Sequence, residues 1–487
     1  MLRIMRTRFA PSPTGVLHVG GVRTALYAYL LAKQTKGQFL LRIEDTDQAR
    51  SVPGTVENII NTLSWCGLTI DEGVTLRDGS ITEIGKLGPY TQSKRLDLYK
   101  KNADQLVASG HAYPCFCTPE RLDEMRKIQQ AAKQAPMYDR QCLKLSKEDV
   151  AQKIAAGEKH VLRLKMPHEE KITFTDEIRG SLEFMGHLID DQVLMKSDGF
   201  PTYHLAHVVD DHFMEIDMVI RGEEWLSSLP KHLVLFRALG WKAPRYAHLP
   251  LLLNLDRTKL SKRQGDVAAD EYRQKGYLPE AMINFLALLG WNPGTEQEIF
   301  SCNELIEAFS LDRVQKAGAV FDLQKLDWLQ GQWIRKLSLS EFAEKIQPFV
   351  MEKFPAALND ADFERKALLI QERMILLPEA AEMLSFFYAF TPPTADVLLN
   401  AKQGVTKDNV NMLKEVLVSS LSSLDAKKWN QESVEKVLMD ALEKNDLKKG
   451  QLLWTLRALL TGKAFSPGAF EVATALGREE TLKRLIS

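Results

Sequence analysis

The sequence predicts an α/β protein in which a parallel-sheet domain is followed by an all-α region. Two observations support this fold class. Short apolar runs alternate with helical patterns through positions 1–325, and positions 326–487 hold only six of the 28 glycines and six of the 20 prolines. A third observation is the length, because 487 residues exceed what one hydrophobic core holds and suggest about three or four domains.

The predicted elements of the first part alternate along the chain. Apolar runs at 39–43 and 217–220 predict buried strands, and helical periodicity at 22–36 and 230–239 predicts helices beside them. This alternation favours a parallel sheet covered by helices.

Two further regions have a different texture. Between about 100 and 190, a charged helical pattern at 119–133 precedes β-rich stretches at 161–165 and 171–175, which indicates an insertion into the α/β domain. The tail has amphipathic runs at 340–350, 408–424 and 432–442, so we expect it to be all-α.

The composition is that of a water-soluble globular protein. Hydrophobic residues make up 45% and charged residues 26%, which excludes collagen-like and largely disordered chains. The 63 basic and 64 acidic side chains leave a net charge of −1, which by itself argues mildly against a nucleic-acid partner. Five cysteines, an odd number, fit reduced thiols, and the sequence has neither a signal segment nor an apolar run long enough to span a bilayer. We therefore expect a cytoplasmic protein without a membrane partner.

A first candidate site lies at the predicted strand–turn–helix over residues 8–21. Unpaired amides at a helix start attract anions, two adjacent glycines allow close approach of a nucleotide, and His18 can donate to a phosphate oxygen. The alternative is an ordinary turn with a surface histidine. The predicted ATP contacts here are Thr14, Gly15, His18, Gly20 and Gly21.

A second candidate is the cationic segment 256–265, which lacks apolar periodicity. Lys259 and Lys262, with Ser261 between them, could neutralise a leaving pyrophosphate if this loop closes over ATP. The alternative is a solvated basic loop.

Together these segments resemble the paired signatures of class I aminoacyl-tRNA synthetases. The sequence His18-Val-Gly-Gly21 is similar to the His-x-Gly-His signature, and Lys259-Leu-Ser-Lys262 to the Lys-Met-Ser-Lys signature. The stretches at 8–21, 41–47, 197–206 and 219–225 look like the bacterial-type glutamyl-tRNA synthetase family, and the likeness covers essentially the whole chain.

The resemblance implies a domain order. It comprises a Rossmann-like catalytic domain split over 1–100 and 191–242, an inserted α+β acceptor-binding domain at 101–190, a connecting stem-contact module at 243–325 that carries the Lys-Leu-Ser-Lys loop, and a helical anticodon-binding region of two subdomains at 326–487.

A glutamate pocket needs cations for the side-chain carboxylate and an acceptor for the ammonium group. Arg8 and Arg221 are the predicted cations, with Tyr203 as a donor and Glu44 for the ammonium. The resemblance adds Ala10, Ser12 and His207. The alternative for Arg221 is an ion pair with Glu223 or Glu224.

The resemblance implies a two-step ligase reaction. Glutamate attacks the α-phosphorus of ATP, used with Mg²⁺, and the resulting adenylate transfers its acyl group to the 3′ end of tRNA(Glu). His18, Lys259, Ser261 and Lys262 are the predicted catalytic residues, and no protein nucleophile is required. The resemblance also implies a monomer that needs bound tRNA for activation.

A structural zinc is a further possibility. Some relatives bind zinc with a Cys-x-Cys pair followed, further along the chain, by Cys-x-His. Here Cys115, Cys117 and Cys142 match in type and spacing, but Lys144 stands at the fourth position. His111 is a substitute ligand in principle, and three thiols without metal are the alternative.

Helical modules can read splayed anticodon bases by stacking and by arginine contacts, so Arg335 and Arg373 are candidates for contact with tRNA, as is Asp47 in the first part of the chain. The resemblance places an anticodon-reading arginine near Arg373. Trp328 and Trp333 are candidates for stacking on bases, with packing between helices as the alternative. Four other functions are alternatives: a truncated paralogue that modifies a tRNA base, glutaminyl-tRNA synthetase, an inactive scaffold, and a nucleotidyltransferase without a tRNA substrate. Whether tRNA(Gln) is also charged stays open.

Overall fold

The computed structural model describes residues 4–260 and 268–486. The chain folds into two compact units. The first comprises Met1–Arg273 with Pro279–Leu323, and the second comprises Gln274–Leu278 with Gln324–Ser487.

A six-stranded sheet forms the centre of the first unit, in the order β11-β10-β1-β2-β3-β4. The strands are β1 (Arg6–Phe9), β2 (Gln38–Leu41), β3 (Glu72–Arg77), β4 (Ser80–Ile84), β10 (Met218–Gly222) and β11 (Arg245–Leu249). All neighbours are parallel except β3 and β4, which are antiparallel. The expected strands at 39–43 and 217–220 correspond to β2 and β10. Strand β11 lies beyond residue 242, where the catalytic domain was expected to end.

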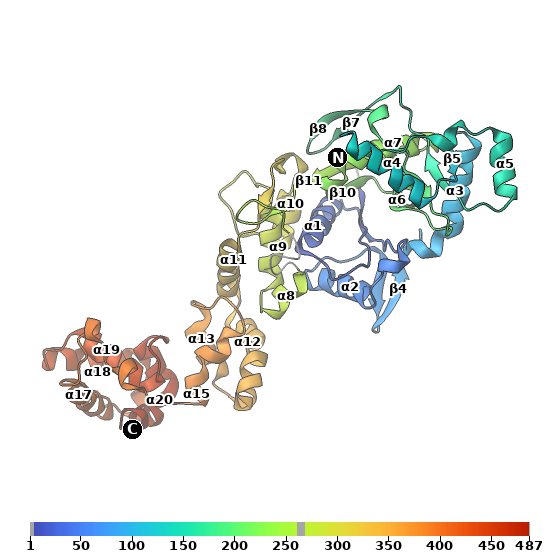
Figure 1. Ribbon diagram of the computed structural model, residues 1–487. Coiled ribbons are helices and arrows are strands. Elements are labelled where there is room, and N and C mark those ends of the chain that lie inside the picture. The colour runs from blue at the N-terminus through green and yellow to red at the C-terminus, as the bar shows by residue number, and fades with distance from the viewer. Residues whose placement is uncertain (1–3, 261–267, 487) are drawn as a thin grey trace. The chain divides into compact units, whose positions relative to one another are not determined.

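Helices cover this sheet, as the near-continuous apolar character of its strands requires. They include α1 (Val19–Gln34), α2 (Thr55–Trp65), α6 (Tyr203–Phe213) and α7 (Leu229–Ala238). Helix α1 buries Val22, Leu26 and Leu30, which recur at every fourth position and therefore share one face. Figure 1 shows α1 beside β10 and β11.

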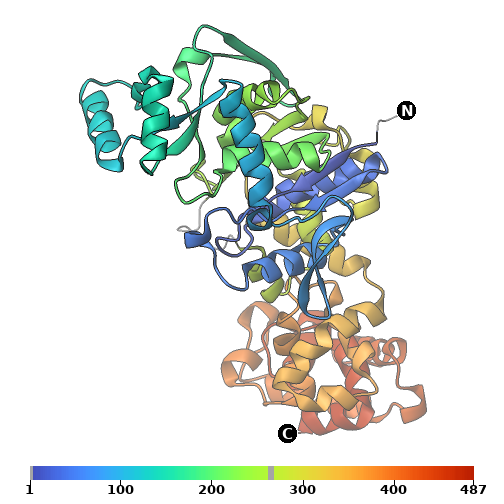
Figure 2. The same ribbon diagram turned by 90° about the vertical axis from the view of Figure 1, so that its right-hand side faces the viewer.

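The expected insertion is a region of mixed structure. Its elements are α3 (Leu96–Ala108), β5 (Ala112–Cys115), α4 (Pro119–Ala131), α5 (Lys147–Ala155), β6 (Val161–Leu164), β7 (Lys171–Asp176), β8 (Gly180–Met185) and β9 (Val193–Met195). Strands β5, β6 and β9 form one small sheet, and β7 and β8 form a separate hairpin. In Figure 2 this region, coloured cyan to green, lies to one side of the main sheet.

The rest of the first unit follows β11. It contains β12 (Leu252–Leu253), α8 (Ala269–Gln274), α9 (Pro279–Leu288), α10 (Cys302–Ala308) and β13 (Ala319–Val320). Strands β12 and β13 pair in parallel. The last residue of α8, Gln274, already belongs to the second unit.

The second unit is helical, as the tail sequence predicts. Its helices are α11 (Leu323–Lys336), α12 (Leu339–Lys353), α13 (Phe363–Gln371), α14 (Glu379–Met383), α15 (Ser385–Tyr388), α16 (Ala395–Leu398), α17 (Val410–Ser422), α18 (Gln431–Lys444), α19 (Lys449–Thr461) and α20 (Ala469–Ile486). Leu413, Leu417 and Leu421 of α17 are buried in a shared apolar core with leucines of α18 and α19. Among the described residues, no helix is both long and apolar enough to cross a membrane.

Candidate active site

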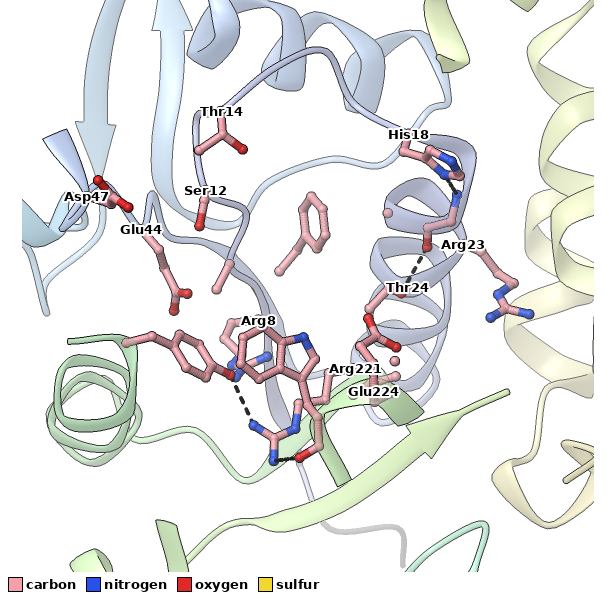
Figure 3. Close-up of a pocket in the computed structure, with 18 of the residues that line it drawn as sticks. Arg8, Ser12, Thr14, His18, Arg23, Thr24, Glu44, Asp47, Arg221 and Glu224 are labelled. Atoms are coloured by element: carbon pink, nitrogen blue, oxygen red, sulfur yellow. Dashed lines mark hydrogen bonds between the residues drawn. The ribbon is translucent and has the colours of Figure 1, made fainter. Parts of the chain in front are cut away.

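A cavity of about 860 Å³ opens where β1 and β10 end and α1 begins. Ligands of open α/β sheets bind at the carboxyl ends of the strands, so this is the expected place for a site. The predicted site residues that line the cavity are Arg8, Ala10, Ser12, Thr14, His18, Gly20, Gly21, Glu44, Asp47, Tyr203, Arg221 and Lys259. In Figure 3 Arg8 and Arg221 lie in one part of the cavity, and His18 lies in another.

Four of the residues predicted to bind glutamate or ATP, or to act in catalysis, are not among those lining residues. Gly15 and His207 belong to the described chain but do not line the cavity. Ser261 and Lys262 lie outside the described residues.

Arg221 is a buried cation whose hydrogen-bond partners are all neutral. Only 5% of the residue is exposed, and its Nη1 donates to the hydroxyl of Tyr203 at 3.0 Å. Its Nε donates to Nε2 of His248 at 3.0 Å, and Nη2 donates to the carbonyl of Trp225 at 3.3 Å. Nδ1 of His232 lies 3.4 Å from both Nη atoms.

The alternative ion pair of Arg221 is wrong. Glu223 pairs with Arg179 instead, and no carboxylate of the described residues lies within salt-bridge distance of Arg221. Burial lowers the pKa of His248 and, more strongly, that of His232, so both rings are neutral at pH 7.

Arg8 has the opposite environment, because a carboxylate already neutralises it. Its Nε and Nη2 donate to the two oxygens of Asp211 at 3.2 and 3.3 Å. Burial acts to raise the pKa of Asp211, but Arg8 and Arg42 outweigh it and hold this pKa well below its ordinary value. Arg42 also donates to Oε1 of Glu44 at 2.9 Å. Among the described residues, no hydrogen bond uses Oε2 of Glu44, which leaves that oxygen to accept from an ammonium group.

Aromatic rings form the wall beside Arg221. Tyr203 stacks on His207 with ring centroids 4.6 Å apart and lies 4.4 Å from the ring of Trp225. His207 lies behind Tyr203, where its Nδ1 is 3.0 Å from the Tyr203 carbonyl and its Nε2 is buried without a partner among the described residues. Its contact is therefore with Tyr203 rather than with the cavity.

The other part of the cavity lies at the start of α1. His18 caps this helix, because its Nδ1 accepts from the amide of Gly20 at 3.0 Å. The neutral ring then carries its proton on Nε2. The first turn of α1 contains no acidic residue, so the positive end of the helix dipole is not neutralised. Packing also favours a glycine at position 21, because a Cβ there would lie 2.8 Å from Cδ1 of Leu17.

Three cysteines of the inserted region come together as predicted. The sulfur atoms of Cys115, Cys117 and Cys142 lie within 4.8 Å of one another. The hydroxyl of Tyr138 lies 3.3 Å from the sulfurs of both Cys115 and Cys117. Lys144 is exposed, whereas the Tyr138 phenol contacts two of the sulfurs, and Nη1 of Arg121 donates to the sulfur of Cys117 at 3.3 Å.

His111 is not placed with these cysteines either. It is exposed, and its Nδ1 lies 3.0 Å from the hydroxyl of Ser109. The cluster therefore has three thiols, which zinc binds as thiolates, and one phenol, whose oxygen would bind a metal only after losing its proton.

The predicted tRNA contacts divide between the two units. Asp47 pairs with Arg50 at 2.6 Å in the first unit. In the second unit, Arg335 donates to the carbonyl of Glu372 at 3.1 Å, and Arg373 donates to the carbonyl of Ser466 at 2.8 Å. The first of these bonds places Arg335 against the residue next to Arg373.

Of the two candidate tryptophans, Trp328 does not fit the alternative of packing between helices. Trp328 is 40% exposed, with the Lys325 ammonium 4.0 Å above its ring, so it is not packed between helices. Trp333 is half-buried, and Lys336 lies 5.1 Å from its ring centroid.

Several residues of the site were missed from the sequence. They are Arg42, Tyr138, Asp176, Asp211, His232 and His248. Arg42 lies in the segment 41–47, which is one of those that carry the resemblance, so the sequence could have identified it. Asp176 and His248 are 72 residues apart, and neither stands in a motif.

A parallel sheet with a cavity at its strand ends, joined in one chain to a helical unit, fits the architecture of a class I aminoacyl-tRNA synthetase, and matches to known families establish this class. Residues 4–328 match the family described as tRNA synthetases class I (E and Q), catalytic domain, and residues 341–487 match the anticodon binding domain family. The chain belongs to the class I (E and Q) tRNA synthetase family, as predicted.

Relatives that align over the full length show that the chain belongs to the glutamate–tRNA ligases of this family, as predicted. The glutamate–tRNA ligase of Chlorobium chlorochromatii is 45% identical, with 99% of this chain and 97% of that protein aligned. That of Clostridium botulinum strain Hall is 45% identical over 100% of this chain and 98% of that protein. A glutamate tRNA ligase from Elizabethkingia meningosepticum, crystallised in complex with its amino acid, is 36% identical, covers 99% of both chains and superposes with a TM-score of 0.88.

Proposed function

We propose that this chain activates L-glutamate with ATP and transfers it to the 3′ end of tRNA(Glu). An oxygen of the glutamate α-carboxylate attacks the α-phosphorus of ATP, and pyrophosphate leaves. A ribose hydroxyl of the tRNA then attacks the carbonyl carbon of the adenylate, and AMP leaves. ATP is used as its Mg²⁺ complex.

The observation that carries this proposal is the charge of Arg221. A guanidinium stays protonated, and this one is buried at the cavity wall with only neutral hydrogen-bond partners. A desolvated cation in such a place is strongly stabilised by an entering carboxylate. The side-chain carboxylate of glutamate supplies that charge, whereas glutamine does not.

The neighbours of Arg221 fit the remaining groups of the amino acid. Arg8 lines the cavity and adds a second guanidinium, although Asp211 offsets its charge. Glu44 faces the cavity as an acceptor for the ammonium group. The backbone of Ala10 and the hydroxyl of Ser12 offer further contacts to the amino acid.

The ATP end of the site works by positioning and by stabilising negative charge. The start of α1 presents amide groups and the positive end of the helix dipole. His18 offers its Nε2 proton to a phosphate oxygen, and Thr14, Gly20 and Gly21 also line the cavity. Lys259 lines the cavity as well, and in the proposal it acts with Lys262 on the leaving pyrophosphate.

The second unit supplies the tRNA-binding part of the proposal. Residues 341–487 match an anticodon binding domain, which a truncated base-modifying paralogue would lack. Arg335 and Arg373 have guanidinium donors beyond the carbonyl bonds described above, and these are suited to phosphates or base edges.

We also propose that the cysteine cluster holds a structural zinc. Cys115, Cys117 and Cys142 supply three thiolates, and the Tyr138 hydroxyl completes the set of four ligands that a closed zinc site requires. Bound zinc would tie the end of β5 to the segment that carries Tyr138 and Cys142.

Charging of purified tRNA(Glu) and tRNA(Gln) with labelled glutamate tests the proposed function. We expect ATP-dependent charging of tRNA(Glu), and loss of at least about a hundredfold in kcat/KM for glutamate in Arg221→Ala. Arg245→Ala is the matched control, since Arg245 lies on the neighbouring strand in an exposed ion pair with Glu177. No charging by the unmutated chain, or equal activity of Arg221→Ala, would contradict the proposal.

A further inference from the structure

Three buried side chains connect the inserted region to the amino-acid pocket in a continuous line. Asp176 ends β7, His248 lies on β11, and Arg221 lies opposite His248 on β10. Their exposed fractions are 1%, 0% and 5%. We propose that Asp176 and His248 are positioning residues that hold Arg221 ready for the substrate carboxylate. This inference rests on the proposed function, because it assigns a purpose to the orientation of Arg221.

The hydrogen-bond donors fix the state of the histidine. Arg221 can only donate, so His248 must accept at Nε2, where the two nitrogens are 3.0 Å apart. A neutral ring that accepts at Nε2 carries its proton at Nδ1, and Nδ1 lies 2.6 Å from Oδ2 of Asp176. The direction of donation is therefore from Arg221 to His248 and from His248 to Asp176.

Asp176 is itself held by the turn of its hairpin. Its Oδ1 accepts from the amides of Ile178 at 3.0 Å and Arg179 at 2.9 Å. Burial acts to raise the pKa of Asp176, but the hydrogen bonds from His248 and these amides outweigh it and lower this pKa. The Asp176 carboxylate is therefore ionised at neutral pH and can only accept hydrogen bonds. An acceptor in this position keeps the proton of His248 on Nδ1.

The neutral imidazole of His248 separates the Asp176 carboxylate from the Arg221 guanidinium, and a comparison with Arg8 shows what this separation achieves. Arg8 contacts Asp211 directly, so its charge is already offset before a substrate enters. Asp176 orients Arg221 indirectly, through His248. No carboxylate of the described residues contacts Arg221, so the charge of its guanidinium is not neutralised. The pocket thus has one guanidinium whose full charge is available to the side-chain carboxylate of glutamate.

The hairpin turn also links a third segment to the pocket. Arg179 pairs with Glu223, and Oε1 of Glu223 accepts from the amide of Leu251 at 2.9 Å. The turn that carries Asp176 is therefore fixed to segments after both β10 and β11. A displacement of hairpin β7–β8 would be transmitted to Arg221 through His248.

Steady-state pyrophosphate exchange with tRNA present tests the proposal. In Asp176→Asn the amide can donate to His248 Nδ1, which favours the tautomer whose Nε2 proton opposes Arg221. We expect KM for glutamate to rise about tenfold, while KM for ATP changes by less than about twofold. Glu177→Gln is the control, because it lies next to Asp176 but removes only the exposed pair with Arg245.

Two variants of His248 separate positioning from simple packing. His248→Gln can accept from Arg221 with its amide oxygen and donate to Asp176 with its nitrogen, so we expect its KM for glutamate to stay within about threefold of the unmutated value. His248→Phe keeps a ring but loses both bonds, and should raise this KM by more than about tenfold. Equal KM values for these two variants, or an unchanged KM in Asp176→Asn, would overturn the proposal.

A spectroscopic measurement does not depend on activity. Nitrogen chemical shifts of labelled histidine should show His248 protonated at Nδ1 in the unmutated chain and shifted toward the other tautomer in Asp176→Asn. Protonation at Nε2 in the unmutated chain would overturn the proposal. Absence of glutamate-dependent exchange in the unmutated chain, with the expected tautomer present, would instead contradict the proposed function.

Discussion

The hydroxyl of Tyr203 accepts a 3.0 Å hydrogen bond from Nη1 of Arg221. Because the oxygen accepts from the guanidinium, the hydroxyl proton remains available to a second acceptor. Tyr203 lines the cavity, so a carboxylate that approaches Arg221 can also accept a hydrogen bond from this hydroxyl. Burial raises the pKa of Tyr203, which keeps the hydroxyl protonated as a donor.

This arrangement predicts a loss of glutamate affinity in Tyr203→Phe. A hydrogen bond to a charged group contributes roughly 1.5–3 kcal/mol, so we expect KM for glutamate to rise about tenfold or more. Tyr246→Phe is a matched control, since the Tyr246 ring lies 5.2 Å from the Arg221 guanidinium but its hydroxyl has no partner among the described residues. Pyrophosphate exchange measures both variants, and equal KM values would contradict the assigned role of Tyr203.

Discrimination against glutamine should follow from the charge of Arg221. A neutral amide would leave this buried guanidinium without a counter-ion, at a cost of roughly 3–5 kcal/mol. We therefore expect kcat/KM for glutamine to be at least about a hundredfold below that for glutamate. Arg221→Leu should narrow this ratio, because it weakens glutamate more than glutamine. A ratio in Arg221→Leu equal to that of the unmutated chain would assign discrimination to other residues.

The sequence predicted those parts of the molecule whose signal is local. Strands β2 and β10 are apolar runs, which the sequence predicted. Arg8 and Arg221 were proposed from segments that resemble a known family, and both line the cavity. The line from Asp176 to Arg221 was not found, because it joins residues from three separate strands. Its members are chosen by tertiary packing, which leaves no spacing to recognise.

The proposed fourth ligand of the cysteine cluster shows the same limit in another form. The spacing rule led to Lys144, just after Cys142, whereas the fold brings Tyr138 to the sulfurs from a position before Cys142. A rule based on spacing cannot identify a ligand of a different residue type on the other side of the last cysteine. Only the positions of the side chains reveal it.

Zinc content gives a direct prediction for this cluster. We expect about one zinc per chain in protein purified without added metal, and loss of the metal in Cys142→Ser because this change leaves only two of the three thiolates. Tyr138→Phe should retain zinc with weaker affinity, measured by competition with a chelator. Cys302→Ser is the control, since Cys302 starts α10 and lies outside the cluster. A zinc content near zero in the unmutated chain would show that the thiols form an ordinary packed cluster.

Acid should destabilise the first unit through its buried histidines. Burial lowers the pKa of His204 to about 3 and lowers those of His207, His232 and His248 below their ordinary values. Below about pH 6.5 the unfolded chain binds protons that the folded chain does not, so stability falls as pH falls. Each histidine contributes up to roughly 1.4 kcal/mol per pH unit in this window.

Urea titrations at about pH 7 and about pH 5, with hydrogen exchange of α6 as the probe, measure this effect. Replacing a histidine of α6 should make the pH dependence shallower, so His204→Gln is the informative variant. His111→Gln is the control, because His111 is exposed. Equal stability of the unmutated chain at the two pH values would contradict the neutral state assigned to these rings.

The two arginines of the second unit lead to a prediction about tRNA. Arg335 and Arg373 each use one nitrogen on a backbone carbonyl, which fixes the guanidinium and leaves its other donors for a ligand. We expect Arg373→Ala to raise KM for tRNA(Glu) about tenfold at moderate salt, with KM for ATP unchanged at saturating tRNA.

If Arg373 contacts a phosphate, the slope of log affinity against log salt should fall by about one; if it contacts a base edge, the slope should stay the same. Lys407→Ala, which removes an exposed cation from the same unit, should leave KM for tRNA within about twofold. A KM for tRNA that is equal in Arg373→Ala and Lys407→Ala would mean that tRNA is read elsewhere on this unit, and the exposed ring of Trp328 would then be the next position to test.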